Sequence, residues 1–457
     1  MSDSDPTAEV VRVDLGTGMP NPCLIPTVQL LSVALEHART SSASDTDAWM
    51  NYGPSEGSAA FRASLAEFLS NSYGELTIEG VRVLPDALFA TNGSSHGLAL
   101  VMRLLAAQWA ALASPGTAAF PACKRATEFR IGVEEHCYWF ALSTLRQVPN
   151  ATLVPLELDC EGVTVPALDG ALPLDAVYII PTGQNPTGRT LSNTRRNAVL
   201  LHAARHAYIV VTDDVYESLT FPEEIDRLAP CGALPLVCLV DAQFREVSPA
   251  IDHHVLVNSF TAVSLGSFSK LVAPSLRCGW LQFPVTHSRK WVRYLGEDGV
   301  VLSGGGYSHF VSEAIRFGLA GVDAWVPRHV ATVRCELAHR CRSLCDSLSV
   351  EIERRGSPHP LSVWRGVTTP QDPLFCKPTA GYFVWLRVPC AAATLVAAAA
   401  TAGVIVKDGS LFDPIVISQT RKHFIRLCFA YADKSMFREG ARQLFRAIDE
   451  VMSWPRV

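Results

Sequence analysis

The feature that most constrains this fold is an alternation of short apolar runs with helical stretches from about Pro85 to Gly305. Such alternation is typical of a parallel sheet whose strands are joined by crossover helices. Residues 98–112 and 192–205 are expected to form helices, the second capped by Ser192. Seven runs are expected to be strands: 87–91, 132–135, 151–156, 176–180, 207–212, 262–267 and 278–283. The sequence therefore predicts an α/β fold with a mainly parallel seven-stranded sheet and helices on both faces.

The pattern changes after about Ser308, which indicates a second, smaller α+β domain. Helices are expected over 308–319, 323–348, 391–402 and 433–452, and strands over 382–386 and 425–429. Because 457 residues exceed what one hydrophobic core usually organises, at least two packed units are expected. We assign residues 1–45 to an N-terminal arm, 46–315 to the large domain and 316–457 to the C-terminal small domain. The stretches 221–254 and 356–378 are expected to be loops.

Composition excludes several classes of protein. With 48% hydrophobic and 18% charged residues, the chain is too apolar for a disordered protein or a coiled coil. A net charge of −5 argues against a nucleic-acid surface. No window is apolar enough for a membrane span, and the acidic start is neither a secretory signal nor a transit peptide, so a cytoplasmic location is expected.

The 13 cysteines do not form a recognisable disulfide or metal pattern. The densest group is Cys335, His339, Cys341 and Cys345, on a predicted helix. Helical spacing puts Cys341 and Cys345 on one face and Cys335 with His339 on another, so their side chains do not converge. We interpret them as reduced thiols on a helix and predict no metal site.

Four segments follow predicted strands, and each has a functional and an ordinary structural interpretation. Segment 91–105 ends a strand in Gly93, Ser94 and Ser95, which suits either a phosphate site at a helix N-terminus or a plain capped turn. Segment 181–188, PTGQNPTG, is a ligand loop or a turn. At the start of segment 212–221, the two carboxylates of Asp213 and Asp214 suit metal, acid–base or capping roles. Segment 267–280 offers a lysine that is either solvated or a nucleophile.

Taken together, in this order and spacing, the four segments resemble one family. The chain is similar to the fold type I pyridoxal-phosphate aminotransferases of class I/II, within which it looks closest to the 2-aminoadipate and kynurenine aminotransferase subgroup. The resemblance runs from about Val13 to the last helix. The matching motifs are Asn185-Pro186-Thr187-Gly188, Asp213 with Tyr216, Ser267-x-Ser269-Lys270, Arg277, Asn51 to Gly57, Gly381 to Leu386 and Phe424 to Leu427.

The resemblance implies how a pyridoxal 5′-phosphate cofactor is held. Lys270 would form the Schiff base with the cofactor aldehyde and later act as the base that moves the proton at the substrate Cα. Asp213 would keep the ring nitrogen protonated, and Asn185 and Tyr216 would bind the phenolic oxygen. The phosphate would be gathered by Ser94, Ser95, Ser267, Ser269 and Arg277, and Tyr138 would lie against the ring.

The resemblance also implies the substrates and the assembly. Arg426 would bind the substrate α-carboxylate, with Asn185 and Gly18 beside it. Tyr52 would reach the phosphate of a neighbouring subunit, so a homodimer is expected. The reaction implied is a ping-pong transfer of an amino group from an α-amino acid to a 2-oxo acid such as 2-oxoglutarate, as part of amino acid metabolism and biosynthesis.

Several positions depart from the family pattern, and they affect substrate choice. His136 stands where proline is usual, insertions occur around 120–130 and 221–254, and Asp408 to Phe412 replaces a common Pro-Gly-x-x-Phe motif. Only seventeen residues precede Gly18, too few for the lid helix with which 2-aminoadipate enzymes of this family recognise a distal carboxylate, and Arg12 is the only arginine there. An aromatic or large aliphatic donor is therefore expected.

Two other functions use the same residues. A pyridoxal-phosphate-dependent β-lyase or another reaction at Cα would need the same motif, because pocket geometry decides which bond breaks. A pyridoxal-binding transcription regulator shares the fold but carries a DNA-binding arm. Only about fifty residues precede Tyr52, and they contain no helix-turn-helix of the required size.

Overall fold

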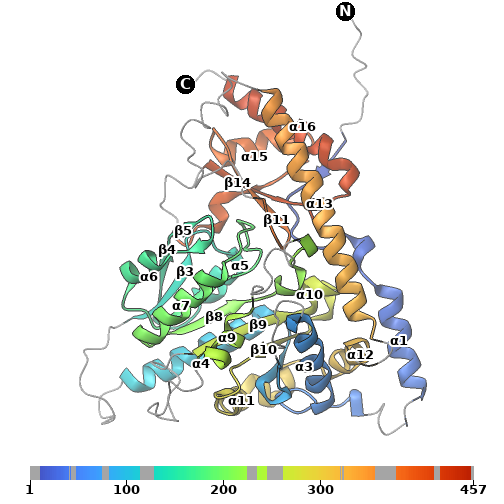
Figure 1. The fold of residues 1–457 in the computed structure, drawn as a ribbon, viewed down its shortest axis with the longest axis vertical. Helices are drawn as coiled ribbons and strands as arrows, with labels where there is room; N and C mark the ends of the chain where they lie inside the picture. Colours follow the sequence, from blue (N-terminus) through green and yellow to red (C-terminus); the bar gives the residue numbers. More distant parts are fainter. Residues whose placement is uncertain are drawn as a thin grey trace, which may run out of the picture.

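The protein consists of a large sheet domain and a smaller sheet domain, seen in the lower and upper parts of Figure 1. The computed structural model describes residues 11–40, 42, 48–74, 82–113, 128–223, 234–243, 261–319, 321, 324–355, 377–415 and 423–453. The predicted loop 356–378 and the insertion around 120–130 lie almost entirely outside these residues.

The large domain is built on a seven-stranded sheet, as the sequence predicts. The strand order is β2-β10-β9-β8-β7-β3-β4, and every pair is parallel except those of β10 with β2 and β9. All seven predicted strands are found, shifted by at most three residues at an end. The strands are β2 (Leu88–Thr91), β3 (Phe129–Glu134), β4 (Ala151–Leu156), β7 (Ala176–Ile179), β8 (Ile209–Asp213), β9 (Thr261–Ser267) and β10 (Gly279–Gln282).

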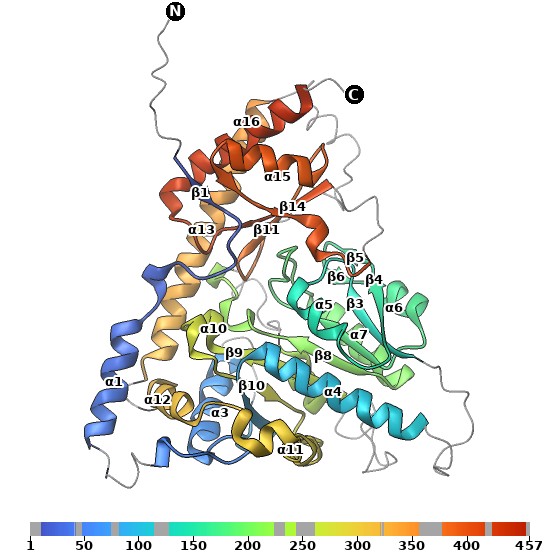
Figure 2. The ribbon, with the colours of Figure 1, turned by 180° about the vertical axis from the view of Figure 1, so that it is seen from behind.

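Helices cover both faces of this sheet, which buries the central strands completely. Figure 2 looks onto the face covered by α4 (Ser94–Ala113) and α11 (Ser288–Gly296), and Figure 1 onto the face covered by α7 (Asn193–His206) and α9 (Leu236–Gln243). Every residue of β7, β8 and β9 is buried. These strands are buried along their whole length because both of their faces pack against helices, and they are rich in apolar residues, with Thr212, Asp213 and Ser264 among the buried polar exceptions.

One loop prediction was wrong. The stretch 221–254 was expected to be irregular, but it contains α9, whose residues Leu236, Val237 and Val240 are buried. A helix of only eight residues gives too little periodicity to be recognised. Residues 224–233 and 244–260 of this stretch lie outside the described residues.

The small domain combines two small sheets with long helices. Strands β11 (Phe383–Arg387), β13 (Lys407–Asp408) and β14 (Phe424–Cys428) form an antiparallel sheet, and β1 (Val13–Asp14) pairs in parallel with β12 (Val404–Ile405). The helices are α13 (Val326–Arg354), α15 (Ala392–Thr401) and α16 (Phe437–Ser453). The N-terminal arm therefore adds a strand to C-terminal residues 391 positions away in the chain.

Three helix starts differ from prediction by three or four residues. Helix α4 begins at Ser94, four residues before the predicted start. Helix α13 begins at Val326, three residues after the predicted start, because Pro327 takes a first-turn position, where its missing N–H is not needed. Helix α16 begins at Phe437 after a short 3-10 turn over Lys434–Met436. Helix α12 (His309–Leu319) lies within one residue of its predicted range.

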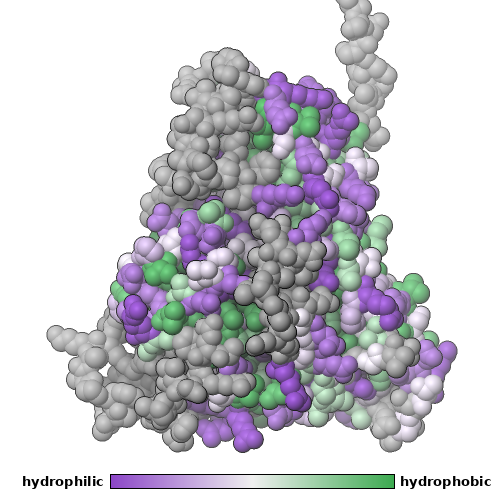
Figure 3. All heavy atoms as spheres, in the orientation of Figure 1, coloured by the Kyte–Doolittle hydropathy of each residue, from purple (hydrophilic) through white to green (hydrophobic). Residues whose placement is uncertain are grey.

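The surface carries one group of exposed apolar side chains near the N-terminal helices. Helix α1 (Thr27–Thr40) has no buried residue and exposes Val28, Leu31 and Leu35, while α3 (Ala59–Gly74) is anchored in the core by Phe61 and Phe68. On the face drawn in Figure 3, the coloured surface is mainly hydrophilic, with hydrophobic residues in small groups. In the part of the chain that the structure describes, no helix is long and apolar enough to cross a membrane.

Candidate active site

A cavity of about 300 Å³ lies where the large sheet meets the small domain. The strands β2, β3, β7, β8 and β9 all point their carboxyl ends toward it, the edge at which such sheets bind ligands. It is lined by Gly18, Met19, Ser94, Ser95, Tyr138, Trp139, Phe140, Ile180, Asn185, Asp213, Val215, Tyr216, Ser267, Ser269, Lys270, Pro274, Arg277, Phe383 and Arg426. Every site residue predicted from the sequence is among them except Tyr52.

Lys270 reaches the cavity from a short helical turn, α10 (Phe268–Leu271), that follows β9 directly. Its Nζ donates a hydrogen bond of 2.9 Å to the carbonyl oxygen of Gly18, and the hydroxyl of Tyr382 donates to the Lys270 carbonyl oxygen at 3.0 Å. Burial lowers the pKa of Lys270 to about 8, and the nearby Arg426 also lowers it. An amine with such a pKa is available as a neutral nucleophile or base near neutral pH.

Asp213 enters the cavity from the end of β8. Its Oδ2 accepts a hydrogen bond of 2.8 Å from the hydroxyl of Tyr178, while its buried Oδ1 has no partner among the described residues. Burial raises the pKa of Asp213 to about 7. Asp214, the neighbouring carboxylate, does not line the cavity, and its Oδ2 accepts from Thr212 and Ser264, each at 2.5 Å. The two carboxylates of segment 212–221 therefore have different environments.

Hydroxyls and one guanidinium converge at the N-terminus of α4. Ser94 and Ser95 form the first turn of this helix, and Ser267 accepts from the Ser269 backbone N–H at 3.1 Å. Arg277 donates to Ser269 Oγ at 3.3 Å. A Cβ on Gly93, whose φ is +97°, would come within 2.8 Å of the Arg277 guanidinium. Backbone amides, hydroxyls and a guanidinium in one place suit a phosphate dianion.

Arg426 is buried at the opposite side of the cavity, on β14. One terminal nitrogen donates to Asn185 Oδ1 at 3.1 Å and the other to the carbonyl oxygen of Gly16 at 2.7 Å. Its buried Nε has no partner among the described residues, and its guanidinium lies 4.2 Å from the centre of the Phe383 ring. Burial lowers the pKa of Arg426, but a guanidinium keeps its charge in proteins.

The loop that carries Asn185 is held by a buried carboxyl group that the sequence analysis did not identify. Glu134, the last residue of β3, accepts from the Ile180 backbone N–H at 3.1 Å and from Gln184 Nε2 at 3.0 Å. Gln184 Oε1 in turn accepts from the backbone and the hydroxyl of Thr187. Burial raises the pKa of Glu134 to about 8, so this carboxyl group is largely protonated at neutral pH.

Two tyrosines also line the cavity. Tyr216 packs with its ring centroid 5.3 Å from that of Tyr382, and burial raises its pKa well above the ordinary value. Burial raises the pKa of Tyr138 to about 12. Both side chains therefore remain neutral phenols that can donate a hydrogen bond or present a ring face.

Tyr52 lies away from this cavity and is 86% exposed. Its ring rests against Gly304, where a Cβ would collide with it. It belongs to a second hollow that includes Trp49, Tyr307 and Phe310. Within one subunit, the structure does not bring Tyr52 to the other predicted cofactor residues.

Several residues of the cavity were not predicted. Tyr178 does not line the cavity but is the partner of Asp213, and it gives no sequence signal because it lies inside an apolar strand, one residue before the strand ends. Trp139 and Phe140 follow Tyr138 directly, and Phe383 lies in the matched segment 381–386, so these three could have been found as neighbours of predicted residues. Met19 is next to Gly18 in the same way.

The cysteine group on α13 has the geometry that helical spacing predicts. Cys341 and Cys345 are buried on one face with their sulfurs 4.0 Å apart, and Cys335 and His339 are exposed on another. Their side chains do not converge on one point.

The cavity fits a pyridoxal phosphate molecule by the chemistry of its donors. A phosphate-binding cluster lies at one side, a buried carboxylate keeps one oxygen without a partner, and a buried lysine carries a lowered pKa. A phosphate, a ring nitrogen and an aldehyde are the groups that such residues bind.

Comparisons with known proteins agree with this geometry. The family described as aminotransferase class I and II matches residues 146–444. The chain is 24% identical over 451 residues to aromatic-amino-acid aminotransferase 1 of Thermococcus litoralis, covering 96% of this chain and 88% of that protein. It is 24% identical to 2-aminoadipate transaminase of Thermus thermophilus, covering 95% and 90%.

A solved structure shares the fold. Kynurenine aminotransferase of Pyrococcus horikoshii, solved in complex with PMP, KYN and KYA, superposes with a TM-score of 0.72 at 21% identity and covers 98% of this chain and 93% of its own. The match of residues 146–444 spans well over half of the sequence. The chain therefore belongs to the family of class I and II aminotransferases, and it is a pyridoxal-phosphate-dependent aminotransferase of fold type I.

Proposed function

We propose that this enzyme moves the amino group of an aromatic or large aliphatic α-amino acid to a 2-oxo acid such as 2-oxoglutarate in a ping-pong reaction. The observation that carries the proposal is the single cavity that contains Lys270, Asp213, Arg277 and Arg426 together. A ping-pong transaminase releases one oxo acid per active site from the donor alone, before any acceptor is added. Single-turnover analysis of the holoenzyme tests this: phenylalanine should give its oxo acid with the nitrogen retained on the enzyme, and a cysteine conjugate that releases pyruvate, ammonia and a thiol faster than phenylalanine is converted would indicate a lyase.

Pyridoxal phosphate supplies the electron sink that stabilises negative charge at the substrate Cα. Ser94, Ser95, Ser267, Ser269 and Arg277 would hold its phosphate. Asp213, through the oxygen that has no protein partner, would bind and keep protonated the ring nitrogen. Asn185 and Tyr216 would bind the phenolic oxygen, and Tyr138 would lie against the ring.

Lys270 is proposed to bind the cofactor aldehyde and then to move a proton. When not bound to the cofactor, its Nζ would serve as the base at the substrate Cα, and the Gly18 carbonyl oxygen, to which it donates at 2.9 Å, would orient it. The lowered pKa of this amine lets it accept the Cα proton and return it to the cofactor side near neutral pH.

Arg426 is proposed to bind the substrate α-carboxylate as a bidentate partner, with Asn185 and Gly18 completing this end of the cavity. Its contact with Asn185 Oδ1 and its stacking on Phe383 hold the guanidinium in one orientation. The Nε of Arg426, which has no partner among the described residues, offers a further hydrogen-bond donor on the same guanidinium group.

The cavity wall supports an apolar donor side chain. Among the described residues that line it, the cations are Lys270, Arg277 and Arg426, and all three already have proposed roles. Much of the remaining wall is apolar and aromatic and includes Met19, Tyr138, Trp139, Phe140 and Phe383. Arg12 is exposed just before β1 and does not line the cavity. A distal carboxylate would therefore face rings rather than a cation.

We expect phenylalanine, kynurenine, leucine or methionine to exceed 2-aminoadipate in kcat/KM. The reason is that a carboxylate loses its hydration against an aromatic wall without gaining a charged partner. Specificity constants measured with one acceptor in one assay decide the question. A tenfold preference for 2-aminoadipate, which is about 1.4 kcal/mol of transition-state discrimination, would contradict the proposal.

We also propose a homodimer in which Tyr52 completes the phosphate site of the partner subunit. Tyr52 is exposed and lies outside its own subunit's cavity, in the hollow that it shares with Trp49, Tyr307 and Phe310. The division into an arm of 1–45, a large domain of 46–315 and a small domain of 316–457 is part of this proposal.

In the described chain, ten cysteines are free thiols, which supports a reducing compartment such as the cytoplasm.

Subunit mixing tests the role of Tyr52. Tyr52→Ala is expected to weaken cofactor binding without unfolding the subunit, because the side chain is exposed. Lys270→Ala is expected to be inactive. Mixed dimers of the two variants should regain activity, about a quarter of the wild-type value after random exchange, because one site then has both an intact lysine and a partner tyrosine. No recovery after proven exchange would show that Tyr52 does not act across the interface.

A further inference from the structure

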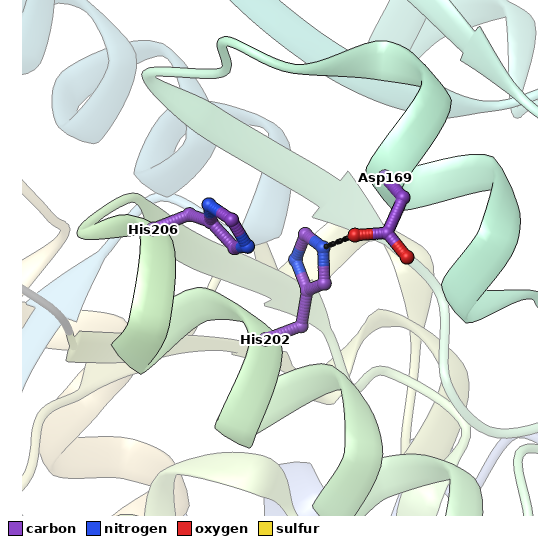
Figure 4. Close-up of side chains that lie close together, drawn as sticks. All are labelled: Asp169, His202 and His206. Atoms are coloured by element: carbon purple, nitrogen blue, oxygen red, sulfur yellow. Dashed lines mark hydrogen bonds and ion pairs between the residues drawn. The ribbon is translucent and has the colours of Figure 1, made fainter.

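A second cluster of ligand-type side chains lies outside the cavity, between two neighbouring helices. Asp169 comes from α6 (Val165–Ala171), and His202 and His206 come from the last turns of α7. One ligand atom from each of the three residues lies within 4.8 Å of the others. Figure 4 shows the two imidazoles side by side, with His202 joined to the Asp169 carboxylate. Asp169 is 33 residues from His202 in the chain, so the sequence alone gave no sign of the cluster.

The buried member of the cluster is already oriented as metal-bound histidines usually are. His202 is buried; its Nδ1 lies 2.9 Å from the Tyr208 hydroxyl and its Nε2 lies 3.0 Å from Asp169 Oδ1. When Nδ1 carries the hydrogen and donates it to Tyr208, Nε2 presents its lone pair toward the carboxylate. His202 Nε2 and Asp169 Oδ1 would then face each other with lone pairs at 3.0 Å. Because two such atoms repel, this arrangement needs a cation between them.

The spacing of two of the three ligand atoms is close to that of a tetrahedral site, and all three lie within 4.8 Å of one another. Ligands at about 2.0–2.1 Å from Zn²⁺ are about 3.3 Å apart, against 3.0 Å between His202 Nε2 and Asp169 Oδ1. The His206 ring centroid lies 4.4 Å from that of His202, and His206 is only partly buried, so its ring is not locked in place by surrounding side chains on every side.

The surroundings also favour a cation that can reach solvent. His206 is the last residue of α7, and the C-terminus of a helix carries partial negative charge. The side chain of Asp169 is 60% exposed while that of His202 is 3% exposed, so the cluster opens outward and leaves room for a water ligand. Imidazole and carboxylate together suit first-row divalent metals.

We propose that Asp169, His202 and His206 bind one divalent transition-metal ion of the Zn²⁺ type, with water as the fourth ligand. The ion would fix α6 against the end of α7. None of its ligands lines the cavity at which amino transfer is proposed, so its role would be structural. Tyr208 is a positioning residue that acts through His202.

The test is a Zn²⁺ titration of chelator-treated holoenzyme under reducing conditions. In competition with a chromophoric chelator, the wild-type protein is expected to bind one equivalent of Zn²⁺. The variants His206→Ala and Asp169→Asn are expected to lose this binding. The matched control is His339→Ala, which replaces an exposed histidine on α13 and should keep the equivalent of bound Zn²⁺. Because His202 is buried and its replacement risks the fold, the two accessible ligands are the ones changed.

Further measurements separate this site from binding at thiols or at the cofactor phosphate. Zn²⁺ should raise the Tm of wild type but not of His206→Ala, and Tyr208→Phe should weaken Zn²⁺ binding about 10- to 100-fold. A Zn²⁺ stoichiometry that is unchanged in His206→Ala would overturn the proposal. So would wild-type protein that binds no Zn²⁺, since Nε2 of His202 would then simply carry a proton to Asp169.

Discussion

Lys270→Ala is expected to abolish amino transfer, with a fall in kcat of at least about 10⁴-fold, the upper range for removal of a positioned base. Among the described residues lining the cavity, Lys270 carries the only primary amine, so no neighbour can replace its proton transfer. The measurement is steady-state turnover with a good donor, followed by the same assay with an added small primary amine, which should restore part of the rate.

A labelling experiment identifies the reactive amine independently. Borohydride reduction of the holoenzyme followed by peptide mapping should place the cofactor label on Lys270. Lys434→Ala is the matched control, because this lysine is exposed on the small domain and should affect neither label nor rate. A label on another lysine would contradict the assignment.

Asp213→Asn is expected to lower the rate of the half-reaction with a good donor by about 10²- to 10³-fold, the range for loss of one aligned electrostatic contact. An amide keeps the shape and the contact with Tyr178 but cannot stabilise a positive charge on a ring nitrogen. The cofactor should still bind, because the phosphate-binding residues are untouched. A near-normal rate would show that protonation of the ring nitrogen is not required.

Asp214→Asn separates this effect from a general loss of buried charge. Asp214 is equally buried, but its Oδ2 is bound by Thr212 and Ser264 and it does not line the cavity. Its replacement should lower stability more than the rate of the half-reaction. A rate loss as large as that of Asp213→Asn would show that the second carboxylate takes part in the chemistry.

Asp213 also gives the cofactor-free protein a pH dependence of stability. Its pKa is about 7 in the folded protein and about 3.9 in an unfolded chain, so the folded state binds the proton more tightly. Its stabilising contribution is therefore complete below about pH 4 and is lost as the pH rises through 7. Unfolding curves of cofactor-free wild type and Asp213→Asn should differ in this window, with the variant less sensitive to pH.

The sequence by itself determined the large sheet and the chemistry at its edge. Runs such as 176–180 and 262–267 are mainly apolar because both faces of their strands are covered, and this makes the strands recognisable from the sequence. Asp213, Lys270 and Asn185 lie one, three and five residues after the ends of such runs, so finding the strands also placed these residues near the strand ends. The family motifs added assignments that spacing alone left open.

Only the tertiary structure decided what surrounds those residues. Contacts between residues far apart in the chain, such as Tyr178 with Asp213 and Lys270 with Gly18, depend on which strands become neighbours and how the arm folds back. The short helix α9 is stabilised by packing rather than by its own periodicity, and so it was missed. The cluster of ligand-type side chains forms only because α6 packs against α7, which brings Asp169 to His202 and His206. No pattern in the sequence of either helix specifies that the two helices pack together.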